Sequence, residues 1–171
     1  MSVLEVVEKF VSINGEGTKA GQLAVFIRFK GCNLNCKYCD TKWANEADAL
    51  AQKMTKEDIL EYVLSTGVKN VTLTGGEPLL RDGIEGVIEC LADNNLNVEI
   101  ETNGSIPLDN IRKLHKDNVT FTMDYKLSCS GMEQAMRLEN FSVLNKNDTV
   151  KFVAGCHEDL VRTKQIIEKY N

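Results

Sequence analysis

The sequence predicts an α/β fold whose parallel strands curve into a partial, abbreviated β/α barrel of about six strands. The first observation is that apolar, strand-like runs alternate with amphipathic, helix-like runs about every 25 residues through the middle of the chain. The second is that conspicuous polar motifs follow the strands at their carboxyl ends, where parallel barrels carry their active sites. The alternation alone also fits an open doubly wound sheet, and the placement of the polar motifs favours the barrel.

The N-terminal part of the chain is expected to hold two strands. Residues 3–13 alternate loosely between apolar and polar and lead into the turn Asn14-Gly15-Glu16-Gly17. Residues 23–29 are almost wholly apolar, as in a strand that is buried on both faces. Arg28 interrupts this run, so its charge is expected either to be neutralised by an ion pair or to bind an anion.

The rest of the chain reads as alternating helices and strands. Thr55 has the sequence context of a helix N-cap and Gly67 ends that helix, whereas the segment 43–53 before it is polar and irregular. The expected strands are 70–74, 97–101, 119–123 and 149–153. The other expected helices are 82–94, 106–115, 133–138 and 157–170, the last with Leu160, Val161, Ile166 and Ile167 as its apolar side.

The composition is that of an ordinary globular protein and narrows the choice of partners. The 171 residues are 43% hydrophobic and 26% charged, so we expect a single domain over residues 1–171. The net charge of −5 argues against a general grip on nucleic acid. The sequence has no apolar run long enough for a membrane span, and its acidic start is unlike a signal peptide. We therefore expect a cytoplasmic protein with no nucleic-acid or membrane partner, in which six cysteines are metal ligands or buried thiols.

Three of these cysteines stand together on one loop. Cys32, Cys36 and Cys39 have the spacing C-x3-C-x2-C and follow the strand 23–29. Iron–sulfur clusters and structural zinc sites usually take four protein ligands, and no histidine or fourth cysteine lies nearby in the sequence. A four-iron cluster on three thiolates leaves one iron open to another ligand, which suits chemistry. A zinc site completed from elsewhere in the chain, or reduced thiols without metal, are the alternatives.

The other three cysteines are scattered. Cys90 falls in a helical apolar pattern and is expected to be a small core residue. Cys129 and Cys156 have no close partner in the sequence. All three are therefore expected to lie outside the cluster site.

The three-cysteine loop and the later motif Gly75-Gly76-Glu77-Pro78 together resemble the radical S-adenosylmethionine (SAM) enzymes. The resemblance implies a radical SAM core domain with a [4Fe–4S] cluster on Cys32, Cys36 and Cys39. SAM would chelate the open iron through its amino and carboxylate groups. Its reductive cleavage would supply a 5′-deoxyadenosyl radical that takes a hydrogen atom from the substrate. The cofactor carries this chemistry, and the protein orients it and excludes water.

A larger set of motifs resembles the 7-carboxy-7-deazaguanine synthase family. These motifs are 12–17, 26–28, 31–34, 39–41, 74–78 and 101–104. The resemblance implies ring contraction of 6-carboxy-5,6,7,8-tetrahydropterin to 7-carboxy-7-deazaguanine with loss of ammonia, on the route to queuosine, and a need for Mg²⁺. It also implies a homodimer, an electron donor such as flavodoxin or ferredoxin, and a C-terminal segment that this chain is expected to lack.

The same resemblance gives roles to individual residues by position. Thr41 would ligate Mg²⁺ through its hydroxyl, and Arg28 would hold the substrate carboxylate. The other residues expected at the substrate are Ile13, Asn14, Gly15, Glu16 and Thr74. Those expected to support the bound cofactors are Tyr38, Asp40, Gly75, Gly76, Glu77, Glu101, Asn103, Asp124, Tyr125 and Lys126. No side chain is expected to be a catalytic acid, base or nucleophile, because the radical arises on the cofactor.

Two other functions fit part of these observations. An activating enzyme for a glycyl-radical protein would use the same cysteine loop, but it would leave Arg28 and Thr41 without a role. A non-catalytic iron–sulfur module for electron transfer would need only the cysteines. It would leave the motifs at 75–78, 101–104 and 124–126 unexplained.

Overall fold

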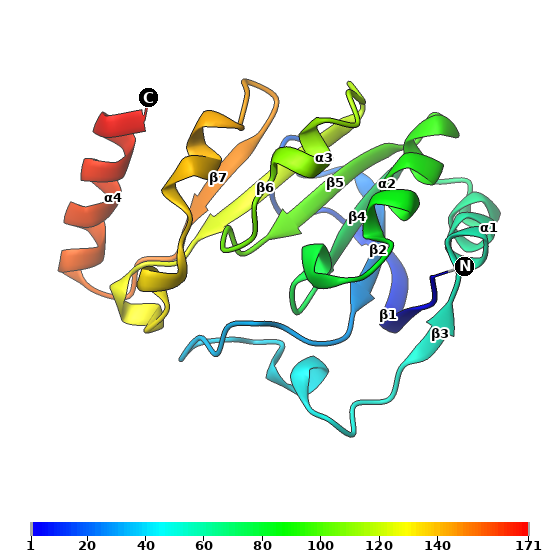
Figure 1. Cartoon of the computed structure of the whole chain (residues 1–171), viewed down its shortest axis with the longest axis horizontal. Coiled ribbons are helices and arrows are strands. Elements are labelled where there is room, and N and C mark those ends of the chain that lie inside the picture. The colour runs from blue at the N-terminus through cyan, green and yellow to red at the C-terminus, as the bar shows by residue number, and fades with distance from the viewer. Residues whose placement is uncertain (1, 171) are drawn as a thin grey trace.

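A computed structural model describes residues 2–170 as one sheet with helices packed against it (Figure 1). The seven strands lie in the order β3-β1-β2-β4-β5-β6-β7. From β2 to β7 the neighbours are parallel, while β1 and β3 are antiparallel to theirs. The strands are β1 Leu4–Ile13, β2 Leu23–Phe29, β3 Gln52–Met54, β4 Asn70–Gly75, β5 Asn97–Thr102, β6 Val119–Tyr125 and β7 Thr149–Phe152. This is the predicted partial β/α barrel, with β3 and β7 at its open edges.

The strand β3 begins at the end of the segment 43–53, which the sequence predicts to be irregular. Its three residues pair with β1, so that Leu4 lies opposite Met54. Two of the three side chains are exposed, and only Met54 is buried. So short a segment has no periodicity of its own, and pairing with a distant strand decides its conformation.

The helices are α1 Lys56–Thr66, α2 Ile84–Asp93, α3 Asp109–Arg112 and α4 His157–Tyr170. The predicted start of α1 is confirmed by a capping box, in which the Thr55 backbone N–H donates to Asp58 across 2.8 Å and the Asp58 backbone N–H donates to the Thr55 hydroxyl across 3.2 Å. Gly67 ends the helix with a positive φ of 70°, which glycine adopts without strain. Local side-chain chemistry therefore fixes both ends of this helix.

Two predicted helices are wrong over most of their length. Of 106–115, only Asp109–Arg112 is helical, because Pro107 disfavours helix at the residue before it and His115 has a left-handed φ of 52°. Of 133–138, only a 3₁₀ turn at the start forms, and the backbone of Arg137 is extended. The Arg137 N–H donates to the carbonyl of Gly104 across 3.2 Å, so a tertiary hydrogen bond replaces a helical one.

The main core lies between the sheet and the helices α1 and α2, which lie in front of the sheet in Figure 1. Ile59 and Val63 of α1 and Ile88 and Leu91 of α2 have no exposed surface. They pack against the apolar residues that alternate along the parallel strands. This layer fixes the positions of the strand ends that carry the site.

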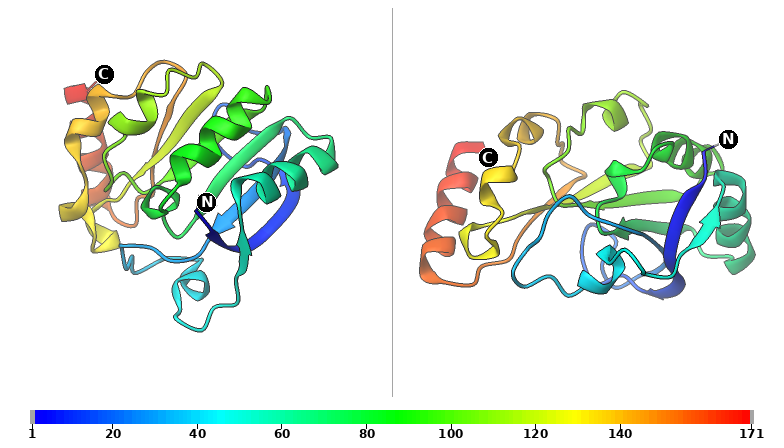
Figure 2. Two further views of the ribbon diagram at one scale, coloured as in Figure 1. Left: turned by 45° about the vertical axis from the view of Figure 1, so that its right-hand side comes forward. Right: turned by 60° about the horizontal axis from the view of Figure 1, so that its bottom comes forward.

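Helix α4 has the predicted bounds but only part of the predicted packing. Of its expected apolar side, Ile166 is buried, while Leu160, Val161 and Ile167 are 46–58% exposed. The helix stands beyond the β7 edge of the sheet in both views of Figure 2, so that only a narrow stripe of it meets other residues. Among the described residues, no helix is both long enough and apolar enough to cross a bilayer.

We expect Leu91→Ala to lower the free energy of unfolding by about 2–5 kcal/mol, because the substitution opens a cavity in the layer between α2 and the sheet. Leu64→Ala on α1 is the matched control. Its side chain is 48% exposed, and the expected loss is under about 1 kcal/mol. Urea titrations of the three chains measure both values. Equal losses would contradict the packing of α2 described here.

Candidate active site

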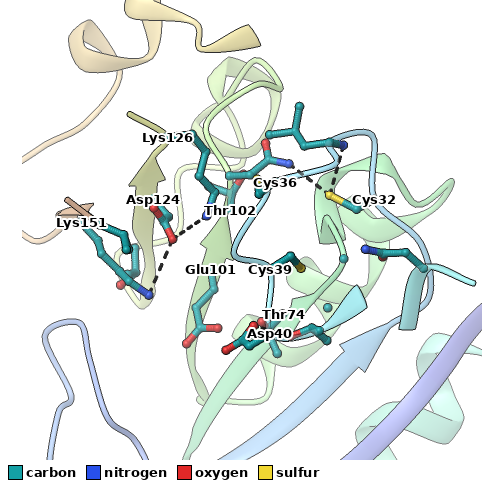
Figure 3. A pocket seen from close by; sticks show the side chains of 18 of the residues that line it. Cys32, Cys36, Cys39, Asp40, Thr74, Glu101, Thr102, Asp124, Lys126 and Lys151 are labelled. Atoms are coloured by element: carbon teal, nitrogen blue, oxygen red, sulfur yellow. Dashed lines mark hydrogen bonds and ion pairs between the residues drawn. The ribbon is translucent and has the colours of Figure 1, made fainter. Parts of the chain in front are cut away.

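A cavity of about 350 Å³ opens at the carboxyl ends of the parallel strands (Figure 3). Each of these strands contributes a polar side chain to it, namely Arg28 of β2, Thr74 of β4, Glu101 of β5, Asp124 of β6 and Lys151 of β7. In the parallel register Arg28 lies beside Thr74, and Asp124 lies beside Lys151. Because side chains alternate between the two faces of a strand, one polar face of the sheet ends at the cavity.

The cavity brings together fifteen of the residues named from the sequence. They are Glu16, Arg28, Cys32, Cys36, Tyr38, Cys39, Asp40, Thr41, Thr74, Gly75, Gly76, Glu101, Asn103, Asp124 and Lys126. They come from six separate stretches of the chain. The strand-end loops therefore meet at one opening, as the barrel prediction requires.

Five of the named residues do not line the cavity. Ile13 and Gly15 are exposed at the rim of the sheet, while Asn14, Glu77 and Tyr125 are buried. Tyr125 follows Asp124 on β6, so alternation turns it to the opposite face, where it packs against Phe141 and Phe152. The expected direct contacts of these five with substrate or SAM are therefore not part of the described cavity.

Glu77 lies behind the cavity wall and joins two of its loops. Its carboxylate accepts hydrogen bonds from the Asn103 backbone N–H at 2.7 Å, the Thr102 hydroxyl at 2.9 Å and the Leu79 backbone N–H at 3.0 Å. Burial raises the pKa of Glu77 to about 7, and the hydrogen bonds oppose that rise. Glu77 thus holds the loop after β5 against the loop after β4.

Gly75 and Gly76 allow the end of β4 to touch the start of the cysteine loop. A Cβ on Gly75 would lie 2.4 Å from the carbonyl oxygen of Phe29, and a Cβ on Gly76 would lie 2.1 Å from that of Gly31. The backbone N–H of Gly76 donates to Phe29, and that of Glu77 donates to Gly31, at 3.1 and 3.0 Å. The two glycines thus allow the two backbones to pack in direct contact, because any side chain at these positions would push the loops apart.

The three cysteines of the loop share the cavity without forming a closed site for one ion. Their Sγ atoms are not all within 4.8 Å of one another, whereas two thiolates on one tetrahedral zinc would be about 3.8 Å apart. The Cys32 sulfur accepts hydrogen bonds from the Leu34 backbone N–H at 3.4 Å and from the Asn103 amide at 3.5 Å. Burial raises the pKa of Cys32 and of Cys36. The three thiols are therefore too widely spaced to share one tetrahedral ion as they stand.

Two buried oxygen atoms in the lining have no hydrogen-bond partner within the described residues. One is Oδ1 of Asn45, beside Gly76, and the other is Oδ1 of Asp124. Buried acceptors without partners are rare in folded proteins, because each loses its hydration. A ligand with ammonium or hydroxyl groups would satisfy them, and SAM carries both kinds. The lining therefore fits the SAM that the sequence resemblance implies.

The charges in the cavity are arranged as alternating pairs. Lys126 contacts Asp124 at 2.8 Å, and Lys151 contacts Glu16 at 2.7 Å and Asp124 at 3.7 Å. Burial raises the pKa of Glu101 to about 7. Glu16 and Glu99 act in the same direction, while Thr74 and Lys151 oppose them. At neutral pH Glu101 is therefore poised between its protonated and ionised forms.

Arg28 forms an ion pair, which is one of the two roles expected for its charge. Its Nε donates to the Glu8 carboxylate at 2.9 Å, outside the cavity, while the residue also lines the cavity. Glu8 thus orients the guanidinium and leaves its remaining N–H donors available for an anion. At the end of the cysteine loop, the Thr41 hydroxyl donates to Asp40 at 2.8 Å. Two oxygen-bearing side chains therefore lie side by side in the cavity lining.

Sequence reasoning missed several residues of the site. The unnamed members of the lining are Leu34, Asn45, Thr102, Thr122, Lys151 and Val153. Thr122 and Lys151 occupy the same alternate positions on their strands as Asp124, so period-two alternation could have identified them. Leu34 lies on an irregular segment and Asn45 ends a short 3₁₀ helix, and the sequence offers no such signal for either residue.

Glu99 is a buried carboxylate that the sequence also left without a role. It is 3% exposed and accepts hydrogen bonds from the Asn14 amide and from the Thr122 hydroxyl. A Cβ on Gly17 would overlap it, at 1.6 Å. Glu99 therefore holds the turn 14–17 in place, and this turn places Glu16 in the cavity lining. Asn14 contributes by donating the hydrogen bond that links the turn to Glu99.

We expect the SAM-free chain to lose stability relative to Glu101→Gln as the pH rises from 4.5 to about 7. In this window the folded chain keeps the Glu101 proton that the unfolded chain has released, so a higher pH favours unfolding. The shift is worth up to about 3 kcal/mol. Urea titrations across this range measure the difference between the two chains. A difference that stays constant with pH would show that Glu101 titrates normally.

Comparison with known proteins places this geometry in a family. The radical SAM superfamily model matches residues 26–125, which hold the cysteine loop and the strand-end motifs. The chain is 59% identical over 168 residues to the 7-carboxy-7-deazaguanine synthase of Clostridium acetobutylicum, covering 98% of this chain and 76% of that protein. It is 34% identical to the enzyme of the same name from Methanospirillum hungatei, with 97% and 68% covered.

A solved structure supports the fold. The crystal structure of QueE from Escherichia coli superimposes with a TM-score of 0.74 over 97% of this chain and 78% of that one, at 24% identity. The fold, the cysteine loop and the sequence identity over nearly the whole chain agree. The chain belongs to the radical SAM superfamily and, within it, to the 7-carboxy-7-deazaguanine synthase family.

Proposed function

We propose that this chain catalyses the radical SAM ring contraction of 6-carboxy-5,6,7,8-tetrahydropterin to 7-carboxy-7-deazaguanine, with loss of ammonia, in queuosine biosynthesis. The observation that carries the proposal is the meeting of the cysteine loop and the polar strand ends at one cavity. A non-catalytic iron–sulfur module would need no such lining. Residues 1–171 would form one radical SAM core domain.

The cofactor end of the cavity would be held by the cysteine loop and by the end of β6. Cys32, Cys36 and Cys39 would bind a [4Fe–4S] cluster, which together with SAM supplies the radical that removes a hydrogen atom from the substrate. The Oδ1 atoms of Asn45 and Asp124 would accept hydrogen bonds from SAM. An electron donor such as flavodoxin or ferredoxin would reduce the cluster.

The substrate end would be formed by β2, β4, β5 and the turn after β1. The substrate joins a carboxylate to a ring with several N–H donors. Arg28, oriented by Glu8, would bind the carboxylate through its remaining donors. Glu16, Thr74 and Glu101 would accept hydrogen bonds from the ring, since all three line the cavity.

Mg²⁺, a homodimer and a cytoplasmic location complete the proposal. Thr41 and Asp40 place a hydroxyl and a carboxylate side by side at the cavity, and oxygen ligands of this kind suit a hard cation that keeps several waters. The hydroxyl of Thr41 would ligate the ion and Asp40 would support it. The family resemblance supports the dimer, and composition supports the location.

The test is an anaerobic product assay with the reconstituted chain, SAM, a reductant, Mg²⁺ and the carboxy-tetrahydropterin. We expect 7-carboxy-7-deazaguanine and ammonia to form together, and turnover to fall when Mg²⁺ is withheld. Formation of 5′-deoxyadenosine without a deazaguanine product would reject this substrate. Turnover that needs a partner protein and ignores Mg²⁺ would favour the glycyl-radical activating function. If SAM left the electron paramagnetic resonance spectrum of the reduced cluster unchanged, an electron-transfer module would be favoured.

We expect Cys32→Ala, Cys36→Ala and Cys39→Ala each to abolish cluster binding, because each would remove one of three thiolate ligands. Cys90→Ala on α2 is the matched control. Its thiol lies outside the cavity, so its iron content should stay close to that of the unchanged chain. Iron and sulfide analysis after reconstitution measures both outcomes. An equal loss of iron in Cys90→Ala would contradict the assignment of the cluster ligands.

A further inference from the structure

The structure joins Cys129 and Cys156, which the sequence left without partners. The Cys129 thiol donates a hydrogen bond to the Cys156 sulfur across 2.8 Å, although 27 positions separate the two residues. Cys129 lies in the turn after β6, and Cys156 immediately precedes α4, two segments that lie together in Figures 1 and 2. Neither residue lines the cavity. The pair is therefore a second thiol site, separate from the cluster loop.

Asp159 of α4 fixes both segments independently of the sulfur atoms. Its buried carboxylate accepts hydrogen bonds from the Gly155 N–H at 2.9 Å, the Ser128 hydroxyl at 2.8 Å and the Cys129 N–H at 3.3 Å. The Gly155 N–H and these other donors hold the pKa of Asp159 well below its usual range. The two thiols are thus held against each other by a charged clamp between the segments that carry them.

This arrangement fits a dithiol better than a metal site. The three residues have ligand atoms within 4.8 Å of one another, but the Asp159 carboxylate is already occupied by three hydrogen-bond donors. Two thiolates on one tetrahedral zinc would be about 3.8 Å apart, and the sulfurs here are 2.8 Å apart. Closing this gap to a bond needs only a small movement of the side chains.

We propose that Cys129 and Cys156 are a reversible modification site that forms an intramolecular disulfide by exchange with a low-molecular-weight disulfide such as oxidised glutathione. The Cys156 thiolate attacks one sulfur of that disulfide and releases one thiol, leaving a mixed disulfide on Cys156. Cys129 then attacks the Cys156 sulfur and releases the second thiol. The two cysteines lose two protons and two electrons, and the reagent disulfide gains them as two thiols.

The two sulfur atoms differ in their hydrogen bonding and surroundings, and these differences assign them different roles in the exchange. The hydrogen bond to Cys156 is the main cause that raises the pKa of Cys129 to about 12, so Cys129 keeps its proton. Cys156 accepts that hydrogen bond and has the exposed residues Gly155 and His157 on either side. Cys156 is therefore the attacking thiol, and Cys129 is the resolving one.

The disulfide between Cys129 and Cys156 would link the start of α4 covalently to the turn after β6, which contacts the cysteine loop. The turn that holds Cys129 accepts the Lys37 N–H at the Ser130 carbonyl, at 3.0 Å, and the segment before Cys156 accepts the Tyr38 hydroxyl at the Val153 carbonyl, at 3.4 Å. Both contacts are with the cysteine loop. Among the described residues of α4, only Asp159 and Ile166 are buried, so the hydrogen bonds of Asp159 are the main contacts that the disulfide would reinforce at the first turn.

The test uses the full chain with its cluster reconstituted, poised without oxygen in glutathione buffers of increasing oxidised fraction. Free thiols are then alkylated, and the peptides are read by mass spectrometry. We expect Cys129 and Cys156 to lose alkylation together at one midpoint, with a peptide linking them. Cys90 is the internal control and forms only a mixed disulfide with glutathione. In Cys129→Ser, Cys156 should stop at the mixed disulfide.

A second readout measures how strongly the disulfide restrains the start of α4. In the oxidised chain, amide hydrogen exchange in the first turn of α4 should slow by roughly tenfold, because local opening of that turn must now move the linked segment. Cys156→Ser should show no such change in the same buffers. The proposal is overturned if no linked peptide forms at any poise or if the two thiols titrate independently. Added zinc that stays bound through desalting and protects both thiols would also overturn it, in favour of a metal site.

Discussion

The cavity depends on one close contact between two backbones. Gly75 and Gly76 at the end of β4 touch Phe29 and Gly31 at the start of the cysteine loop, with no room for a Cβ on either glycine. Two backbone hydrogen bonds hold this contact, and they set the height of the cysteine loop above the sheet. In the sequence these glycines look like a ligand-binding motif. In the structure they first of all allow two backbone segments of the protein to pack in direct contact.

Buried carboxylates connect further segments around the cavity through hydrogen bonds. Glu77 connects the loop after β4 to Asn103 on the loop after β5, and Glu99 connects β5 to the turn that carries Glu16. Each is removed from water and is stabilised by neighbouring N–H and hydroxyl donors, which offset the cost of burial. Asp159 does the same at α4. Three acidic residues without direct contact to the cavity thus place the segments that surround it.

The sheet divides its two faces between stability and chemistry. Along β6, Asp124 faces the cavity while Tyr125 packs in the smaller apolar cluster. Several charges on the cavity face are paired, as in the contact of Lys151 with Glu16, and this pairing offsets part of the cost of removing them from water. The orphaned acceptors Asn45 and Asp124 are the exception. Both acceptors belong to the cavity lining, where a ligand could supply the missing donors.

The sequence by itself determined the strands other than β3, the helices α1, α2 and α4, and the cysteine loop, because these follow from periodicity and capping over a few neighbouring residues. It also placed most of the lining, since parallel strands bring their carboxyl ends together. Only the tertiary structure decided the strand β3, the position of Glu77 behind the wall and the pairing of Cys129 with Cys156. Each of these rests on contacts between residues far apart in the chain, and such contacts leave no local pattern for the sequence to display.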